Sequence, residues 1–206
     1  IRTGKHTGQI MVCLIINGKT LPHADKLADC LKDISGMSSI MININKERTN
    51  VILGSECSVI WGNSYIEDSI CGIMFRISPL SFFQVNPVQT EKLYRKALEY
   101  AELTGNETVW DLYCGIGTIG IIAASKAKEV IGVELNADAV RDAVQNAKCN
   151  DVKNIRFYCN DATEFMMQMA ASGDTVDVVL MDPPRAGSTE AFIKAVAAVK
   201  AKTVIY

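Results

Sequence analysis

Asp111-Leu112-Tyr113-Cys114-Gly115-Ile116-Gly117-Thr118-Ile119-Gly120 joins a short run of strand-forming residues to a helix through a glycine-rich loop. Glycine accepts a positive φ and lets the backbone approach a ligand where a Cβ would clash. Gly115, Gly117 and Gly120 therefore predict a loop that lies against a nucleotide-like cofactor. The spacing Gly-x-Gly-x-x-Gly is a weak signal when it stands alone, so the residues that follow it have to identify the ligand.

Three acidic residues follow the loop, each at the end of an apolar run, where an open α/β sheet forms its ligand crevice. Glu134 ends the first run and is placed to accept both ribose hydroxyls of an adenosine. Asp161 ends the next and is placed to accept from an adenine amino group. Asp161 is equally typical of a helix N-cap, with Glu164 as its capping-box partner, and the two roles are compatible.

Asp182 is the third of these acids and begins Asp182-Pro183-Pro184-Arg185. The two prolines keep Asp182 out of the helical region and make a stiff rim with free carbonyls and no N–H donors. S-adenosylmethionine (SAM) carries no phosphate, so its loop needs no N–H groups directed at an anion. Asp111 suits the methionine amino group of SAM, or else it holds the loop. Together these acids predict SAM rather than a nicotinamide cofactor, and hence a class I methyltransferase.

From Thr108 onward, apolar runs alternate with amphipathic segments, which predicts a doubly wound parallel sheet of the Rossmann-like kind. Strands are expected at 108–114, 129–135, 155–160, 176–182 and 203–206. Helices are expected at 117–126, 137–149, 162–171 and 189–200.

Residues 1–77 are expected to form a separate small α+β domain before the cofactor-binding domain, 78–206. Its strands are expected at 9–17, 38–45, 50–53 and 59–60, with a helix from about His23. The basic, glycine-bearing segment 2–8 is expected to be a turn rather than a phosphate site.

The cofactor-binding domain is expected to open with a helix that has Asn86 as its N-cap, Pro87 at its first position and an end near Leu103. Phe82 and Phe83, just before the cap, are expected in the core, because two phenylalanines in a strand are more often buried than used in binding.

Composition bounds the function only weakly. The formal net charge is −2 over 206 residues, and composition alone gives no support for nucleic-acid binding. Seven cysteines show no C-x-x-C and no metal-ligand spacing, so no metal site is predicted and a reducing, cytoplasmic location is expected. Neither a signal peptide nor a membrane-spanning run is present. Because the chain starts at Ile1 and stops in the apolar run 203–206, it is expected to be a piece of a longer protein.

Four motifs make the chain resemble the SAM-dependent RNA 5-methyluridine (uracil-C5) methyltransferases of bacterial tRNA and 23S rRNA. Asp-Pro-Pro-Arg together with Phe-Gln-x-Asn is fairly specific to that family, whereas the glycine loop is generic. The motifs are Ser81-Phe82-Phe83-Gln84-Val85-Asn86, Asp111-Leu112-Tyr113-Cys114-Gly115-Ile116-Gly117, Gly132-Val133-Glu134 and Asp182-Pro183-Pro184-Arg185-x-Gly187.

The resemblance implies a SAM site lined by Gln84, Tyr113, Glu134, Asp161 and Asp182. It also implies that Gln84 and Asp182 face the target uracil, and that the first 77 residues contact RNA. An OB-like TRAM domain, and in some members an iron–sulfur cluster, would precede Ile1. No membrane or protein partner is implied.

Uracil C5 is too weak a nucleophile to take a methyl group directly. A cysteine thiolate adds to C6, the enolate attacks the sulfonium methyl, and a base then removes the C5 proton so that the thiolate is eliminated from C6. In the family that cysteine follows the fifth strand, beyond Tyr206, and Cys114 and Cys159 are expected to be packing residues. The chain is therefore expected to hold no catalytic nucleophile, with Asp182 and Arg185 as supporting residues at most. Alone, we expect it to be inactive and to self-associate through its final strand.

Two other functions stay open at this stage. An exocyclic-amine methyltransferase also uses Asp-Pro-Pro but usually follows it with an aromatic residue, where this chain has Arg185. The second open function is that of a module that binds SAM or RNA without catalysis. Sequence leaves open whether the target is tRNA or rRNA.

Overall fold

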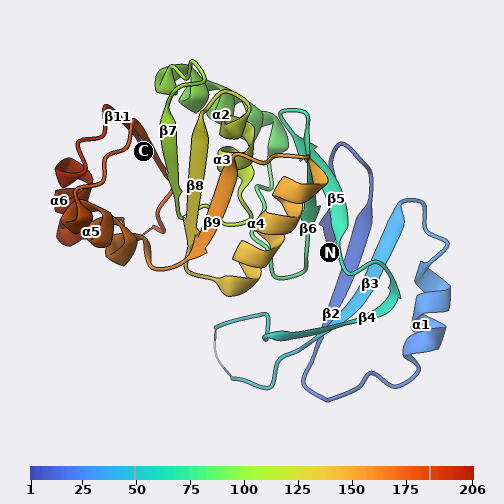
Figure 1. Ribbon diagram of the computed structural model, residues 1–206. Coiled ribbons are helices and arrows are strands. Elements are labelled where there is room, and N and C mark those ends of the chain that lie inside the picture. Colours follow the sequence, from blue (N-terminus) through green and yellow to red (C-terminus); the bar gives the residue numbers. More distant parts are fainter. Residues whose placement is uncertain (49, 186) are drawn as a thin grey trace. The chain divides into compact units, whose positions relative to one another are not determined.

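The computed structural model describes residues 1–48, 50–185 and 187–206 (Figure 1). The chain forms two compact units. The first comprises Ile1–Ser69 and Met74–Ser81, and the second comprises Ile70–Ile73 and Phe82–Tyr206. The expected boundary after residue 77 falls inside the segment Met74–Ser81.

The first unit is a small α+β structure, as predicted. Its four-stranded sheet has the order β1-β2-β3-β4, in which only the β2–β3 pair is parallel. Helix α1 follows β2, and a two-stranded sheet of β5 and β6 follows β4. The bounds are β1 Arg2–Thr3, β2 Ile10–Ile16, α1 Ala24–Leu31, β3 Met37–Ile44, β4 Glu56–Gly62, β5 Ile66–Ile70 and β6 Ile73–Ile77.

The strand predicted at 50–53 is wrong. Asn45 donates from Nδ2 to the carbonyl oxygens of Val51 and Ile52, so these carbonyls pair with a side chain in a loop. Both apolar side chains are exposed. Sequence analysis also missed the pair β5–β6, whose two-residue turn has φ of 54° at Cys71 and 82° at Gly72. Such turns usually carry Asn-Gly or Asp-Gly, and Cys-Gly lacks that signal.

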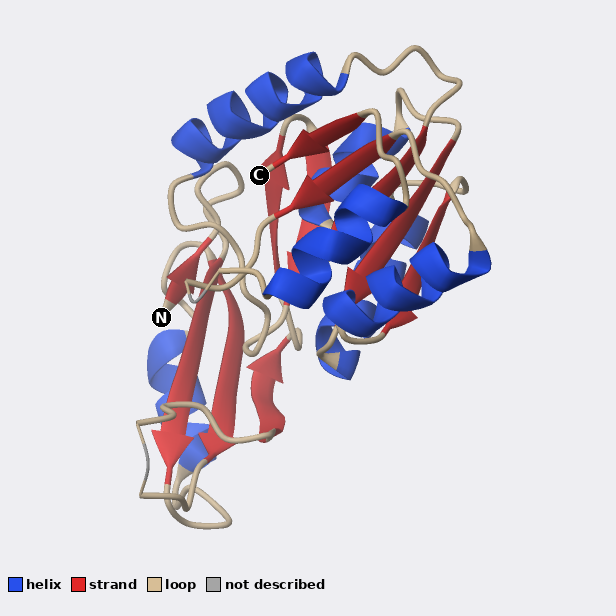
Figure 2. Cartoon of the chain, turned by 90° about the vertical axis from the view of Figure 1, so that its left-hand side faces the viewer, coloured by secondary structure: helices blue, strands red, loops and turns tan. Residues whose placement is uncertain are grey.

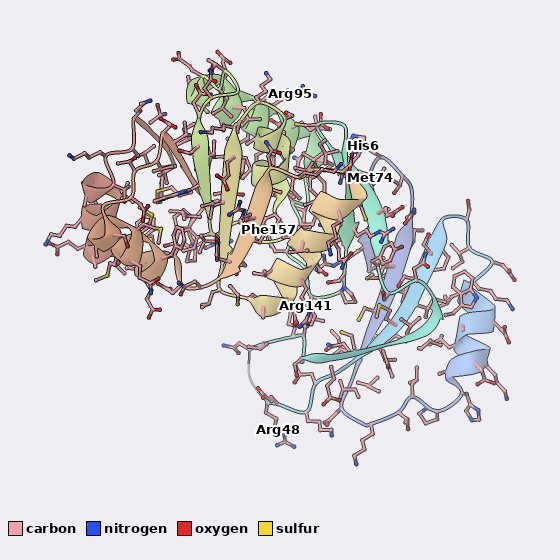
Figure 3. The ribbon with its side chains drawn as sticks, in the orientation of Figure 1. His6, Arg48, Met74, Arg95, Arg141 and Phe157 are labelled. Carbon is pink, nitrogen blue, oxygen red and sulfur yellow. The ribbon has the colours of Figure 1, made fainter. Side chains whose placement is uncertain are left out.

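Residues 5–7 of the basic segment form a turn, as predicted, whereas Arg2–Thr3 form the short strand β1. The amides of Lys5 and His6 both donate to the buried Asp68 carboxylate at 2.8 Å. These N–H groups are thus occupied by a carboxylate of the same unit and do not point to a free anion. Figure 3 labels His6, which lies in this turn.

The second unit is the predicted doubly wound sheet. Its strand order is β11-β10-β7-β8-β9, and every neighbouring pair is parallel. Helices lie on both faces of the sheet (Figure 2), with α3 and α4 in contact with each other and α5 and α6 in contact with each other. The bounds are α2 Pro87–Ala101, β7 Thr108–Leu112, α3 Thr118–Ala124, β8 Glu129–Glu134, α4 Ala137–Cys149, β9 Ile155–Cys159, α5 Ala162–Ser172, β10 Val178–Met181, α6 Glu190–Ala198 and β11 Thr203–Ile205.

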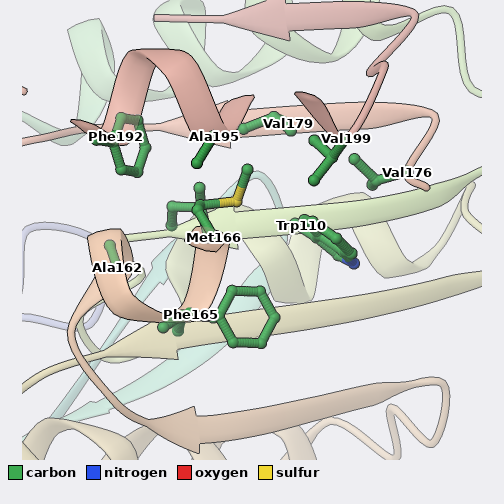
Figure 4. Packing of buried hydrophobic residues seen from close by; sticks show 11 residues of the cluster. Trp110, Ala162, Phe165, Met166, Val176, Val179, Phe192, Ala195 and Val199 are labelled. Atoms are coloured by element: carbon green, nitrogen blue, oxygen red, sulfur yellow. The ribbon is translucent and has the colours of Figure 1, made fainter. Parts of the chain in front are cut away.

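Strand β7 divides its side chains between the two faces, as the two-residue period of a strand requires. Trp110 and Leu112 join the buried cluster against α5 and α6, where Trp110 meets Phe165 edge to face at 5.4 Å (Figure 4). Asp111 points to the other face and meets the start of α3. The strand therefore supplies both a core anchor and a polar group for the loop.

Both predicted helix caps are confirmed. The Asn86 side chain accepts from the amide of Gln89 at the start of α2. The Asp161 side chain accepts from the amides of Thr163 and Glu164 at the start of α5. These oxygens satisfy amides that have no partner inside the helix.

Asp177 ties together three strands at their amino ends. Its Oδ2 accepts from the amide and hydroxyl of Thr108, which begins β7. Its Oδ1 pairs with Lys202 at 2.6 Å, and its carbonyl accepts from the amides of Lys202 and Thr203 at β11. The hydrogen bond from Lys202, followed by those from Thr108, lowers the Asp177 pKa from 3.8 to about 2.

We expect Asp177→Asn to lower the free energy of unfolding at pH 7 by roughly 1 to 2 kcal/mol, because it loses charged hydrogen bonds. A lowered folded-state pKa stabilises the fold above the unfolded-state pKa, and that contribution disappears as the pH falls from 3.8 to about 2. Urea unfolding from pH 7 down to 2 measures both effects, with the exposed Asp174→Asn as control. A constant difference across that range would contradict the assignment.

Candidate cofactor-binding site

A pocket of about 170 Å³ opens at the carboxyl ends of β7, β10 and β11, beside α2 and the start of α3. In the strand order, β7 has its sequence neighbour β8 on one side and β10 on the other. Ligands of doubly wound sheets bind at this reversal point. The polar residues that line the pocket are Gln84, Tyr94, Asp111, Tyr113, Thr118, Asp182 and Tyr206.

The loop after β7 turns sharply through left-handed backbone. Tyr113 has φ of 65°, Gly115 of 55° and Gly117 of 82°. Tyr113 carries a Cβ in this region, which costs free energy that the surrounding structure has to offset. The turn directs the Tyr113 ring to the pocket wall, where it lies 5.8 Å from the Phe192 ring.

The three glycines of the loop serve different purposes. Only Gly115 lines the pocket, and a Cβ there would meet open space. A Cβ on Gly117 would come within 2.9 Å of the Phe157 ring, which β9 supplies (Figure 3). A Cβ on Gly120 would come within 2.7 Å of the Asp111 carboxylate. Two of the three glycines therefore serve packing within the fold.

Asp111 holds the loop and also lines the pocket. Its Oδ2 accepts from the Gly120 amide at 2.9 Å, while the side chain is 2% exposed. Burial is the largest cause that raises its pKa, to about 7, and the charges of Asp182 and Glu134 add to it; the Gly120 hydrogen bond opposes them. A cation in the pocket would reverse this balance, because it would favour the ionised carboxylate.

Glu134 fastens the loop to the next strand. One carboxylate oxygen accepts from the Gly115 amide at 3.0 Å, and the other accepts from the Asn136 amide at 2.8 Å. Glu134 does not line the pocket itself. It stands one strand away, at the end of β8, with lone pairs left on both oxygens for further donors.

The structure brings together five of the eight residues predicted to bind the cofactor. Gln84, Asp111, Tyr113, Gly115 and Asp182 line the pocket. Gly117, Glu134 and Asp161 lie outside it, along the ends of β7, β8 and β9. Arg185 is exposed and does not line the pocket.

Sequence analysis missed two polar residues and misjudged an aromatic one. Tyr94 of α2 and Thr118 of α3 line the pocket with their hydroxyls 3.2 Å apart. The tyrosine follows the Asn86 cap by two helical turns, a spacing that could have predicted its position. Phe82 lies in no strand and is 71% exposed at the pocket wall, so its expected core position is wrong.

Cys114 is the one cysteine among the pocket-lining residues. Burial raises the pKa of its thiol well above the ordinary value, and Asp111 and Glu134 raise it further. Within residues 1–48, 50–185 and 187–206, no group of three acidic, histidine or cysteine side chains could hold a metal ion. In the same part of the chain, no helix has the length and apolarity needed to cross a membrane.

Comparison with known proteins finds relatives along the whole chain. A family model described as a methyltransferase domain matches residues 103–204. An uncharacterized RNA methyltransferase of Halalkalibacterium halodurans is 48% identical over all of this chain, and one of Clostridium tetani is 44% identical over all of it. The chain spans 45% of the length of each of these curated relatives.

One solved structure is similar to nearly the whole chain. It is the Pyrococcus abyssi tRNA (uracil-54, C5)-methyltransferase in complex with S-adenosyl-L-homocysteine, which matches 98% of this chain with a TM-score of 0.80 and 29% identity. The match covers 47% of that chain. By sequence and by fold, this chain is similar to these RNA methyltransferases, and its residues 103–204 match a methyltransferase domain.

Proposed function

We propose that the chain is the cofactor-binding part of an enzyme that transfers a methyl group from SAM to C5 of a uridine in RNA. The observation that carries the proposal is the meeting of Gln84, Asp111, Tyr113 and Asp182 around one pocket at the reversal point of the sheet. Its support comes from the similarity to a uracil-C5 methyltransferase solved with S-adenosylhomocysteine (SAH).

The pocket suits one end of SAM. Its volume of about 170 Å³ is below the roughly 300 to 1,000 Å³ of sites that enclose a whole drug-sized ligand. We therefore assign the pocket to the methionine end, beside Asp111 and Gly115. The adenosine end would extend along the sheet edge toward Glu134 and Asp161, which lie outside the pocket.

The acidic residues divide the binding work. Asp111, buried beneath the loop, would pair with the methionine ammonium and become ionised in doing so. Glu134 would accept the ribose hydroxyls on the lone pairs that the Gly115 and Asn136 amides leave free. Asp161 would accept from the adenine amino group while it continues to cap α5.

SAM, when bound, supplies an electrophilic methyl group on a positively charged sulfur. Asp182, at the pocket rim after β10, adds negative charge near that position. Gln84 offers an amide with both donors and an acceptor, the groups needed to recognise the edge of a uracil. The exposed Phe82 ring at the same wall gives a flat apolar surface beside that amide.

The nucleophile that uracil-C5 chemistry requires is not Cys114 in this proposal. Its raised pKa keeps the thiol protonated, whereas the reaction needs a thiolate. The thiolate and the base that removes the C5 proton would come from sequence outside these 206 residues, since the curated relatives are more than twice as long. Asp182 and Arg185 would at most support the reaction.

The test of function uses a protein extended to the length of the relatives. Tritium transfer from labelled SAM to unmodified tRNA and rRNA should yield 5-methyluridine after digestion, and the 206-residue chain should yield none. A product methylated on an exocyclic amine would refute the uracil-C5 assignment. Transfer by the short chain would refute the placement of the nucleophile.

We expect Glu134→Ala to weaken SAH binding by about 10- to 100-fold, the loss of hydrogen bonds to a charged group. Calorimetric titration measures it, and Glu129→Ala, at the opposite end of β8, is the matched control. The 2′-deoxy analogue of SAH separates ribose contact from loop damage. If the parent and mutant discriminate equally between SAH and the analogue, Glu134 does not contact the ribose.

We expect SAH affinity to rise about tenfold or more between pH 5.5 and 7.5, because the ligand ammonium favours ionised Asp111. The pKa of Asp111 without ligand is about 7, so its ionisation, and with it the rise in affinity, falls in this pH range. Asp111→Asn should flatten the profile, while the exposed Asp151→Asn should leave it intact. Without ligand, the free energy of unfolding should fall as the pH rises from 3.8 to about 7, because the folded state favours protonated Asp111.

A further inference from the structure

Helix α4 carries a fully buried asparagine, Asn146. Its exposed fraction is 0%, and the other buried residues of this helix are the alanines 143 and 147. A side-chain amide buried among apolar groups costs free energy unless its polar atoms find hydrogen-bond partners. The role of Asn146 therefore follows from what its amide group contacts.

The Asn146 amide donates into the glycine loop. Its Nδ2 lies 3.3 Å from the carbonyl oxygen of Ile116, and the hydrogen bond is buried. Ile116 stands between Gly115 and Gly117 in the loop, and it lines the cofactor pocket together with Gly115. Because α3 and α4 also pack against each other, this bond ties the loop to a helix that is itself held in place.

The Ile116 carbonyl accepts from Asn146 at a point where the helical hydrogen-bond pattern is interrupted. In a continuous α-helix, the amide of residue 120 would donate to the carbonyl of residue 116. The Gly120 amide donates instead to Asp111 Oδ2 at 2.9 Å. Asp111 thus takes the amide, and Asn146 the carbonyl, of the hydrogen bond that a longer helix would form.

These two side chains fix the boundary between the loop and α3. Without the Asn146 donor, the buried Ile116 carbonyl would need another partner, and the Gly120 amide is the donor that helical geometry offers it. That exchange would lengthen α3 and release the Asp111 carboxylate. It would also move the backbone of Gly115 and Ile116, which lines the pocket.

A second asparagine, Asn154, holds the other end of the same helix. Its Nδ2 donates to the carbonyl oxygens of Ala124 and Ala127, at 2.8 and 3.0 Å, where α3 ends. Both asparagines therefore donate to backbone carbonyls beside one helix. Of the two, Asn146 alone contacts a residue of the pocket wall, so Asn154 is a matched control.

We propose that Asn146 is a positioning residue for the cofactor. By holding the Ile116 carbonyl, it keeps the Gly120 amide on Asp111 and the glycine loop in the form that binds SAM. The inference rests on the proposed function in so far as this loop binds SAM. Asn146 does not line the pocket and acts through the loop.

The direct test records backbone amide signals by NMR in protein labelled with ¹⁵N-glycine, where Gly115, Gly117 and Gly120 report on the loop. In Asn146→Ala the Gly120 signal should shift, because its amide leaves a carboxylate for a carbonyl. SAH affinity should fall about tenfold, the change for one hydrogen bond. Asn154→Ala should lower stability but leave the loop signals and the affinity unchanged.

Three results of this test would overturn the proposal. The first is a set of unmoved loop signals in Asn146→Ala. The second is an unchanged SAH affinity in that variant. The third is an equal effect of Asn154→Ala on signals and affinity, since Asn146 would then only support α3 as a whole.

A second variant separates the hydrogen bond from the packing of the side chain. Asn146→Leu keeps a γ-branched side chain of similar shape at the buried position but has no donor. It should shift the loop signals and weaken SAH binding as Asn146→Ala does, and it carries the test if the alanine variant does not fold. Parent-like signals in Asn146→Leu would show that the filled space, rather than the bond to Ile116, sets the loop.

The pH dependence of SAH binding supplies a readout that a general loss of stability would not move. The Gly120 hydrogen bond lowers the Asp111 pKa, so its loss in Asn146→Leu should move the midpoint of the pH profile upward. Asn154→Ala should keep the midpoint of the parent. An unmoved midpoint in Asn146→Leu would contradict the proposal. A parent that binds no SAH would instead refute the proposed function, while the glycine signals would still decide whether Asn146 sets the loop.

Discussion

The hydrogen bond from the Gly120 amide to the buried Asp111 carboxylate connects the central strand to the helix that follows the glycine loop. It fixes where α3 begins, and it explains the glycine at position 120, since any Cβ there would collide with the carboxylate. The same burial raises the pKa of Asp111 to about 7. One contact thus joins the architecture of the loop to the electrostatics of the pocket.

Most of the parallel sheet could be predicted, because its strands and helices alternate with clear apolar periods and its helices carry recognisable caps. The Asn86 and Asp161 caps are local in sequence, and local signals predict well. The failures come from long-range or atypical contacts. Residues 50–53 look like a strand, but the Asn45 side chain pairs with their carbonyls. The β5–β6 turn uses Cys71, which carries no turn signal.

The acidic residues that line the pocket could be predicted from the sequence, and its other lining residues were harder to predict. Asp111 is the penultimate residue of β7 and Asp182 directly follows β10, and the carboxyl ends of strands converge at one edge of a parallel sheet. Tyr94 reaches the pocket from a helix, and its spacing from the Asn86 cap predicts its place on the helix but does not distinguish a pocket residue from a core aromatic. Gly117 and Gly120 fit the cofactor motif, yet glycine is needed there because a Cβ would collide with Phe157 at position 117 and with Asp111 at position 120. A motif identifies the loop, whereas only the packing shows what each glycine does.

Tyr113 stands in left-handed backbone, with φ of 65°, at the point where the central strand passes into the loop. Glycine or asparagine would adopt this conformation at lower cost, by roughly 1 kcal/mol or more for glycine. Neither would supply a ring between Phe192 and the pocket. Laboratory evolution under heat alone would thus drift toward glycine or asparagine at 113, and evolution under ligand selection would retain the aromatic. The residue found at position 113 after selection would therefore show whether the variants had been selected for thermal stability or for ligand binding.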